Sequence, residues 1–287
     1  MALAEFHCHT IYSKGSKILI EGLNRPREML KAAKKLGVEI IAITDHDTMR
    51  GIKEARYWAR KLDLLLIPGE EITTNRGHVL ALGINEEVKR GIDFFEALDT
   101  IHEQGGIAIA AHPFDFRKEG AGKLAVYCDA IEAFNAMNLD RFANWRAFRF
   151  AKENGMSMVA GSDAHCVEML GHGLNVLSPC QTIDEVLNAI KRGEVRMKTK
   201  YMPTTIMGEW IVRRLRYSYY YVVDYISHNY SRPKRAISLR LLRLVEKSPG
   251  KIDIVLKILA YFGLCCVGVY SAFRNVLIAS LLELLGW

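Results

Sequence analysis

The sequence lacks the short motifs that identify several common classes of protein. It has no glycine-rich phosphate loop and no Rossmann fingerprint, so no nucleotide cofactor is indicated. None of its six cysteines form a Cys-x-x-Cys pair, and 287 residues is the wrong length for a disulfide-stapled scaffold. No basic region followed by a long apolar stretch opens the chain, so we expect no signal peptide. These absences favour a reduced compartment and a cytoplasmic protein.

Charge is distributed unevenly along the chain. The net charge is +7, yet residues 1–195 are slightly acidic. Residues 196–287 hold 15 Lys and Arg against 5 Asp and Glu. Such asymmetry suggests an anionic partner, either nucleic acid or a lipid surface. We therefore expect two parts, a domain over 1–195 and a basic, apolar, helical extension over 196–287.

Apolar, strand-like segments alternate with amphipathic helical patterns through the first 195 residues. The seven expected strands are 3–9, 38–44, 64–68, 79–84, 107–111, 130–134 and 157–160. Continuous apolar strands alternating with helices predict an α/β fold with a mainly parallel sheet, and seven of them allow a closed barrel. In such barrels the chemistry lies at the carboxyl ends of the strands.

Six of the nine histidines lie in short motifs at the ends of these segments, and acidic residues accompany four of the seven segments. The residues that follow a strand are His7, His9, Asp45, His46, Glu70, His112, Asp163 and His165, whereas His78 precedes one. Imidazole and carboxylate are ligands of Zn²⁺, Mn²⁺ and Fe²⁺. His7 and His9 are two residues apart, which places both rings on one face of a strand. The pattern predicts a multinuclear metal site and a metallohydrolase.

These motifs, in this order, resemble those of the PHP (polymerase and histidinol phosphatase) family over about residues 1–195. They read His7-Cys8-His9-Thr10, Ile43-Thr44-Asp45-His46-Asp47, Gly69-Glu70-Glu71, Ala111-His112-Pro113 and Gly161-Ser162-Asp163-Ala164-His165. The resemblance implies a distorted seven-stranded (β/α) barrel that hydrolyses phosphoesters. It also implies two or three divalent metal ions, Mn, Fe or Zn.

The resemblance implies a ligand set as well. The first ion would be held by His7, His9, Glu70 and Asp163. Glu70 would bridge to a second ion on His78 and His112, and a third would bind His46 and His165. We count Asp45, His46 and His165 as catalytic and interpret Glu71 as orienting a ligand or facing solvent.

One stretch departs from the family pattern. The family often has an Asp shortly after its second His, whereas residues 12–16 here contain no acid. Lys14 could instead contact the substrate phosphate, or the third site could be weak or empty. Arg76 and Arg117 lie in loops after strand ends and are further candidates for phosphate binding.

We expect a metal-bridging hydroxide to attack the phosphorus of a phosphate ester. A nucleotide or short oligonucleotide is the favoured substrate. If the protein is an enzyme with another substrate, we expect a histidinol-phosphate-type small-molecule phosphatase. If it is not an enzyme, we expect a non-catalytic metal-stabilised binding module.

The extension contains sixteen uncharged residues between Lys257 and Arg274. Helices are expected over 209–230, 237–246 and 252–285. Three interpretations stand: a helical subdomain packed on the barrel or on a second copy, peripheral contact with a membrane, and a spanning helix. Every candidate ligand precedes residue 196, so we expect residues 201–287 to be dispensable for the chemistry.

Overall fold

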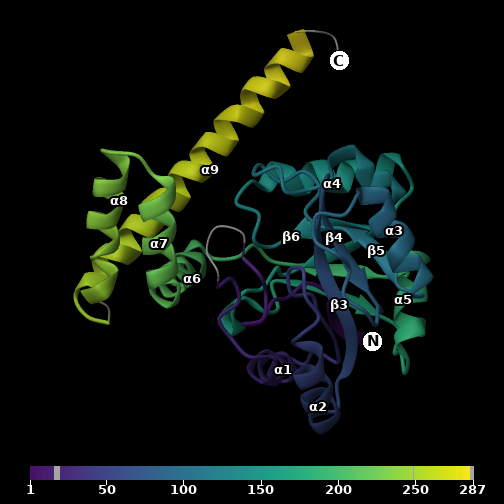
Figure 1. The fold of residues 1–287 in the computed structure, drawn as a ribbon. Coiled ribbons are helices and arrows are strands. Elements are labelled where there is room, and N and C mark those ends of the chain that lie inside the picture. Colours follow the sequence, from purple (N-terminus) through teal and green to yellow (C-terminus); the bar gives the residue numbers. More distant parts are fainter. Residues whose placement is uncertain (16–19, 248, 285–287) are drawn as a thin grey trace.

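A single nine-stranded sheet, curved into a barrel and covered by helices, forms the body of the protein (Figure 1). The computed structural model describes residues 1–15, 20–247 and 249–284. The strands are β1 (Ala2–Glu5), β2 (Ile40–Ile43), β3 (Leu65–Thr74), β4 (Gly77–Leu82), β5 (Ile107–Ala110), β6 (Ala130–Asn135), β7 (Ser157–Gly161), β8 (Gly173–Leu177) and β9 (Arg196–Thr199). The helices around them are α1 (Pro26–Lys35), α2 (Ile52–Leu62), α3 (Phe94–Glu103), α4 (Arg141–Glu153) and α5 (Ile183–Lys191).

Strand number and direction differ from the expectation of seven mainly parallel strands. The order is β7-β6-β5-β4-β3-β2-β1-β8-β9, and among the described strands four neighbouring pairs are parallel and four antiparallel. β3 runs on to Thr74, so only two residues separate it from β4, and so tight a turn joins antiparallel strands only. β9 reads Arg-Met-Lys-Thr and is largely exposed, so it carries no apolar signal. It extends the sheet beyond residue 195.

The two ends of the sheet meet, and the barrel is nearly closed. The buried Asn175 side chain on β8 accepts a hydrogen bond from the Ala160 amide of β7 (2.9 Å) and donates one to the Ala160 carbonyl (2.7 Å). Beyond the strand ends, the His9 amide donates to the Ala164 carbonyl at 2.8 Å. The chain after β1 is thereby joined to the chain after β7, and the motifs of both strands face each other.

Alternation along the strands separates the inner core from the outer layers. On β5, Ile107 and Ile109 join a buried cluster that draws on β1 to β8 and α5, which places it inside the barrel. Ala108 and Ala110 join a different cluster, with α3 and α4. Neighbouring side chains of a strand point to opposite faces, so β5 contributes to both clusters.

Helix ends follow the local sequence. Pro26 opens α1, and the Glu28 carboxylate accepts the Arg25 amide at 2.8 Å. Gly37, past the end of α1, has φ +77°, a conformation that glycine adopts without strain. At the start of α5, the Thr182 hydroxyl accepts the Glu185 amide at 3.2 Å, as the capping-box pattern predicts.

In the part of the C-terminal extension that the structure describes, four α-helices and a short 3-10 helix (Val245–Lys247) lie beside the barrel. The α-helices are α6 (Thr204–Tyr217), α7 (Tyr219–Asn229), α8 (Lys234–Leu242) and α9 (Ile252–Leu284). The single helix expected over 209–230 is two helices that meet at Ser218, and the one expected over 237–246 begins earlier and ends at Leu242. The end expected for the last helix, residue 285, lies outside the described residues.

Helix α9 packs on α6 at one end and projects past the other helices at the other (Figure 1). Gly208 of α6 permits the contact, because a Cβ there would lie 2.3 Å from the Tyr261 ring. Residues Ile252–Phe273 are long and apolar enough to cross a membrane, and 6% of that stretch is buried. Low burial sets it apart from the core helix of a globular domain.

The closure of the barrel by Asn175 can be tested directly. Asn175→Ala should lower the free energy of unfolding by roughly 2–4 kcal/mol, because the Ala160 amide and carbonyl lose their buried partner. Urea unfolding measures the change. In the control, Asn154→Ala, the lost hydrogen bond to the Phe150 carbonyl is exposed, so the cost should stay below about 1 kcal/mol. Equal losses in both variants would contradict the role of Asn175.

Candidate metal centre

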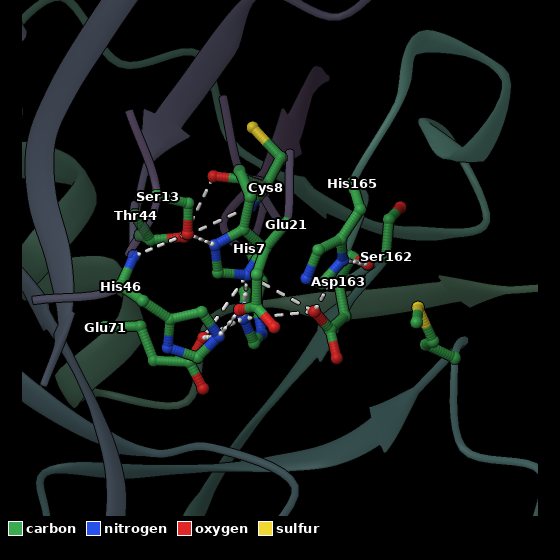
Figure 2. Close-up of polar contacts among 12 residues, drawn as sticks. His7, Cys8, Ser13, Glu21, Thr44, His46, Glu71, Ser162, Asp163 and His165 are labelled. Atoms are coloured by element: carbon green, nitrogen blue, oxygen red, sulfur yellow. Dashed lines mark hydrogen bonds and ion pairs between the residues drawn. The ribbon is translucent and has the colours of Figure 1, made fainter. Parts of the chain in front are cut away.

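Six histidines and two acidic residues converge at one edge of the sheet, where most of the parallel strands end. They are His7, His9, His46, Glu71, His78, His112, Asp163 and His165, several of which are shown in Figure 2. His78 joins them although it precedes its strand, because β4 runs antiparallel to β3 and pairs His78 with Thr73. The start of β4 therefore lies at the same edge as the end of β3.

The Glu71 carboxylate lies at the middle of the cluster and faces five imidazoles. Its Oε2 atom is 3.1 Å from His7 Nε2, 3.2 Å from His9 Nε2 and 3.3 Å from His46 Nε2. Its Oε1 atom is 2.9 Å from His78 Nδ1 and 3.0 Å from His112 Nε2. The two oxygens of one carboxylate thus face two different groups of histidines.

Glu70, the acid that the sequence analysis places at this position, points away from the cluster. Adjacent residues of a strand face opposite sides, and β3 turns Glu71 toward the histidines. The Glu70 carboxylate instead accepts the Val88 amide at 3.0 Å. The interpretation of the Glu pair is therefore corrected, with Glu71 central and Glu70 outside.

Asp163 and His165 enter the cluster from the chain after β7. Asp163 Oδ1 lies 3.3 Å from His9 Nε2 and 3.6 Å from His7 Nε2. The His165 ring stacks on His9, with centroids 4.3 Å apart. Asp163 and His112 have φ values of 50° and 27°, a region that non-glycine residues seldom adopt. Strain of this kind gathers at functional sites, where the surrounding structure holds it in place.

Glu132, on β6, contacts the His7 ring on the side away from Glu71. Its Oε1 atom is 2.8 Å from His7 Nδ1, and its Oε2 atom accepts the His112 amide at 2.7 Å. Asn135 donates to the same carboxylate at 3.0 Å and to Asp163 at 3.1 Å. A carboxylate on the far nitrogen fixes the tautomer of a metal-ligating histidine and leaves Nε2 free to bind.

Burial and mutual charge shift the pKa values of the cluster in opposite directions. Burial lowers the pKa of His9 and of His112. Hydrogen bonds from His9 to Asp163 and Glu71, and from His112 to Glu71, outweigh it and raise both pKa values to about 9. Burial raises the pKa of Glu71, but His46, His7 and His78 outweigh it and hold that pKa well below the usual value. For His165, burial and the charge on His9 lower the pKa to about 3. The carboxylates of the cluster therefore favour positive charge at the positions of His9 and His112.

The donor set fits divalent metal ions. Three groups of ligand atoms lie within 4.8 Å of one another: His7, His9 and Glu71; His46, Glu71 and His78; and His9, His46 and His165. Imidazole with carboxylate is the ligand set of Zn²⁺, Mn²⁺ and Fe²⁺. Glu71 belongs to two of the three groups, the position of a bridging ligand.

Asp45 does not face the cluster. Its buried carboxylate accepts hydrogen bonds from the Thr10 amide and, at 2.7 Å, from the Thr10 hydroxyl. It therefore fixes the chain that follows His9. The structure gives it a positioning role in place of the catalytic one expected.

A cavity of about 210 Å³ opens over the histidines. Lys14 and Arg117 line it, as expected of phosphate-binding residues, whereas Arg76 lies exposed at the β3–β4 turn and is not part of its lining. Lys14 Nζ is 3.1 Å from Glu87 Oε1, and Arg117 Nη2 is 3.0 Å from Glu119 Oε2. Both cations are held at the rim by acids.

Three further residues of this cavity carry no signal in the sequence: Glu21, Trp210 and Arg214. Glu21 Oε2 lies 3.3 Å from His46 Nε2, and its segment is seated by the Leu23 amide, which donates to the His165 carbonyl at 2.8 Å. Arg214 pairs with the Glu21 carboxylate and donates to the Ile20 carbonyl at 2.7 Å. The Trp210 indole lies 4.9 Å from the His165 ring. Helix α6 thus forms a wall of the site, although we expected residues 201–287 to lie apart from the chemistry.

Comparisons with known proteins agree with this architecture. A PHP-associated family model matches residues 141–195. An uncharacterised protein of Methanocaldococcus jannaschii is 36% identical over 147 residues, which are 49% of this chain and 86% of that protein. The 5'-3' exoribonuclease of Haemophilus influenzae is 30% identical over 109 residues, 37% of each chain.

A solved structure shares the fold. It is a two-domain Bacteroides vulgatus protein containing a predicted PHP-like metal-dependent phosphoesterase. The two structures match with a TM-score of 0.56 and 17% sequence identity, over 73% of this chain and 69% of the Bacteroides chain. The two structures share the barrel-like sheet, and in this chain imidazoles and carboxylates converge at one edge of that sheet. The chain belongs to the PHP family, as its motifs suggested.

The two neighbouring glutamates provide a matched test of the metal centre. Glu71→Gln should bring the metal content, measured by elemental analysis after reconstitution with Mn²⁺ or Zn²⁺, from at least two ions per chain to below one, because the shared carboxylate is lost. Glu70→Gln should bind metal as the unchanged protein does. Burial raises the pKa of Glu70 to about 8, so an amide closely matches its neutral form. Equal loss in both variants would contradict the assignment of Glu71.

Proposed function

We propose that this protein hydrolyses phosphate monoesters at two or three divalent metal ions held by the cluster around Glu71. The observation that carries the proposal is the sharing of that carboxylate between two groups of ligand atoms. When bound, such ions lower the pKa of water and polarise phosphoryl oxygens. Water adds to phosphorus, the bond from phosphorus to the ester oxygen breaks, and the products are the alcohol and inorganic phosphate.

The ligand assignment follows the distances. His7, His9, Glu71 and Asp163 would hold the first ion, and Glu71 would be shared with a second on His78 and His112. His46 and His165 would hold a third. Glu21, 3.3 Å from His46, would supply the carboxylate that residues 12–16 lack.

The remaining cavity residues suit a phosphate group. Arg117 and Arg214 present guanidinium groups, whose planar fork of donors matches phosphoryl oxygens. Their acidic partners, Glu119 and Glu21, hold them in place before substrate arrives. Burial lowers the pKa of His46 and of His165, which favours the neutral imidazole that a metal ion binds.

Two classes of substrate remain. A nucleotide or short oligonucleotide is favoured by the sequence and supported by the exoribonuclease relative. A small phosphorylated alcohol, as for the histidinol-phosphate branch, is supported by the wall that Trp210 and Arg214 raise over the cavity. A site with such a wall admits a terminal phosphate group more readily than a phosphate in the middle of an oligonucleotide.

Catalysis should depend on both metal and Asp163. Asp163→Asn should lower kcat/KM for a phosphate monoester by a factor of about 100 or more, because removing a charged group of a catalytic site costs several kcal/mol. Chelation should abolish turnover, and added Mn²⁺ or Zn²⁺ should restore it. Asp99→Asn, on the exposed surface of α3, is the control and should change nothing. Full activity of Asp163→Asn would rule out the proposed site.

We also propose that the extension brings the barrel to an anionic membrane surface. Support comes from the exposed apolar length of α9 and from the exposed basic residues on and before α8, among them Arg232, Lys234 and Arg240. Basic residues close to an anionic surface contribute about 1 kcal/mol each. Self-association through α9 is the competing use of the same surface.

Vesicle sedimentation distinguishes these uses. The full chain should bind vesicles that contain anionic lipid. Neutralising Arg232, Lys234 and Arg240 together should weaken binding roughly 100-fold, as three contributions of about 1 kcal/mol imply. The control variant neutralises the exposed Lys35, Arg56 and Lys123 of the barrel and should bind normally. Equal binding by both variants would contradict an electrostatic attachment.

A further inference from the structure

A second cavity, of about 320 Å³, adjoins the metal cavity. The two share Arg117, Met137, Asp163, Trp210 and Arg214 as lining residues. A molecule whose phosphate lies against the metal cluster can therefore extend past the two arginines into the second space. The volume lies within the range typical of sites that bind small ligands.

Helices α6 and α9 build one side of this second cavity, and the chain after β6 builds the other. Met207, Ile211 and Leu215 come from α6, and Leu264 comes from α9. Leu139 faces them from the segment between β6 and α4. Figure 1 shows α6 placed between the barrel and the rest of the extension. The C-terminal extension is thus part of the binding site for whatever the phosphate is attached to.

The chemistry of the lining indicates an apolar occupant. Among the described lining residues the charged or amide side chains are Arg117, Asn138, Asp163 and Arg214, and all but Asn138 also line the metal cavity. The Trp210 indole N–H already donates to the Glu21 carbonyl at 3.0 Å. The Asn138 amide nitrogen already donates to Asn144 Oδ1 at 2.8 Å. A nucleobase buried here would leave its ring nitrogens and amino groups without partners, at a cost that an alkyl chain does not incur.

We propose that the second cavity binds an alkyl chain on the alcohol side of the scissile bond. On this basis the substrate is the phosphate monoester of an apolar alcohol. The proposal rests on the proposed function, which supplies the hydrolysis, and deepens it by naming the substrate class. It assigns Leu139, Leu215 and their neighbours as specificity-determining residues.

The test uses the full-length, metal-loaded protein and a series of n-alkyl phosphates from ethyl to octyl. Burial of one methylene is worth about 0.8 kcal/mol, so kcat/KM should rise up to roughly fourfold per methylene until the cavity is full. AMP and ribose 5-phosphate serve as comparison substrates, and hexyl phosphate should exceed both by at least tenfold. Equal kcat/KM across the alkyl series, or a preference for AMP, would overturn the inference and leave the proposed function standing.

Variants locate the effect. Leu139→Ser and Leu215→Ser, both half-buried at the cavity, should flatten the dependence of kcat/KM on chain length. Leu36→Ser, at the exposed end of α1, is the matched control and should keep the full dependence. An unchanged dependence in both cavity variants would overturn the inference.

A binding measurement separates the inference from the proposed function. Octylphosphonate and methylphosphonate cannot be hydrolysed at phosphorus–oxygen ester bonds, because they have none. Calorimetry on the metal-loaded protein should find octylphosphonate bound at least tenfold tighter, and Leu139→Ser should remove that difference. If no phosphate ester is hydrolysed yet this difference is found, the proposed function fails and the apolar site stands. If esters are hydrolysed and the two phosphonates bind alike, the apolar site fails.

Discussion

The burial of one carboxylate among five imidazoles is the constraint on which the site depends. Glu71 stays charged without contact with water because its oxygens face His7, His9 and His46 on one side and His78 and His112 on the other. An isolated buried carboxylate would take up a proton. The buried histidines in turn depend on this carboxylate, which contacts a nitrogen of each of the five rings.

Strand pairing delivers these groups to one place. The antiparallel β3–β4 pair brings His78 beside the end of β3, and the link between His9 and Ala164 draws the ends of β1 and β7 together. The Asn175 side chain joins β8 to β7, where the two ends of the sheet meet. A barrel nearly closed in this way fixes distances between residues far apart in the chain, which is what a site for several ions requires.

The extension changes how the site is understood. Trp210 lies against His165, and Arg214 pairs with Glu21, which itself faces His46. The same helix packs on α9, whose apolar surface is largely exposed. The proposed attachment and the proposed substrate site would therefore share α6 and α9.

The sequence alone determined the family, the alternation of strands and helices, and six of the histidines in the site. The periodicity of apolar residues and the motifs at strand ends each lie within a short stretch of sequence, so they can be recognised without a structure. It did not determine which of Glu70 and Glu71 turns inward, since that depends on the pairing of β3 with β4. Nor did it place Glu21, Trp210 and Arg214, which reach the cluster only through contacts between segments about 190 residues apart. Those contacts arise from the packing of α6 on the segment before α1, and no local pattern encodes them.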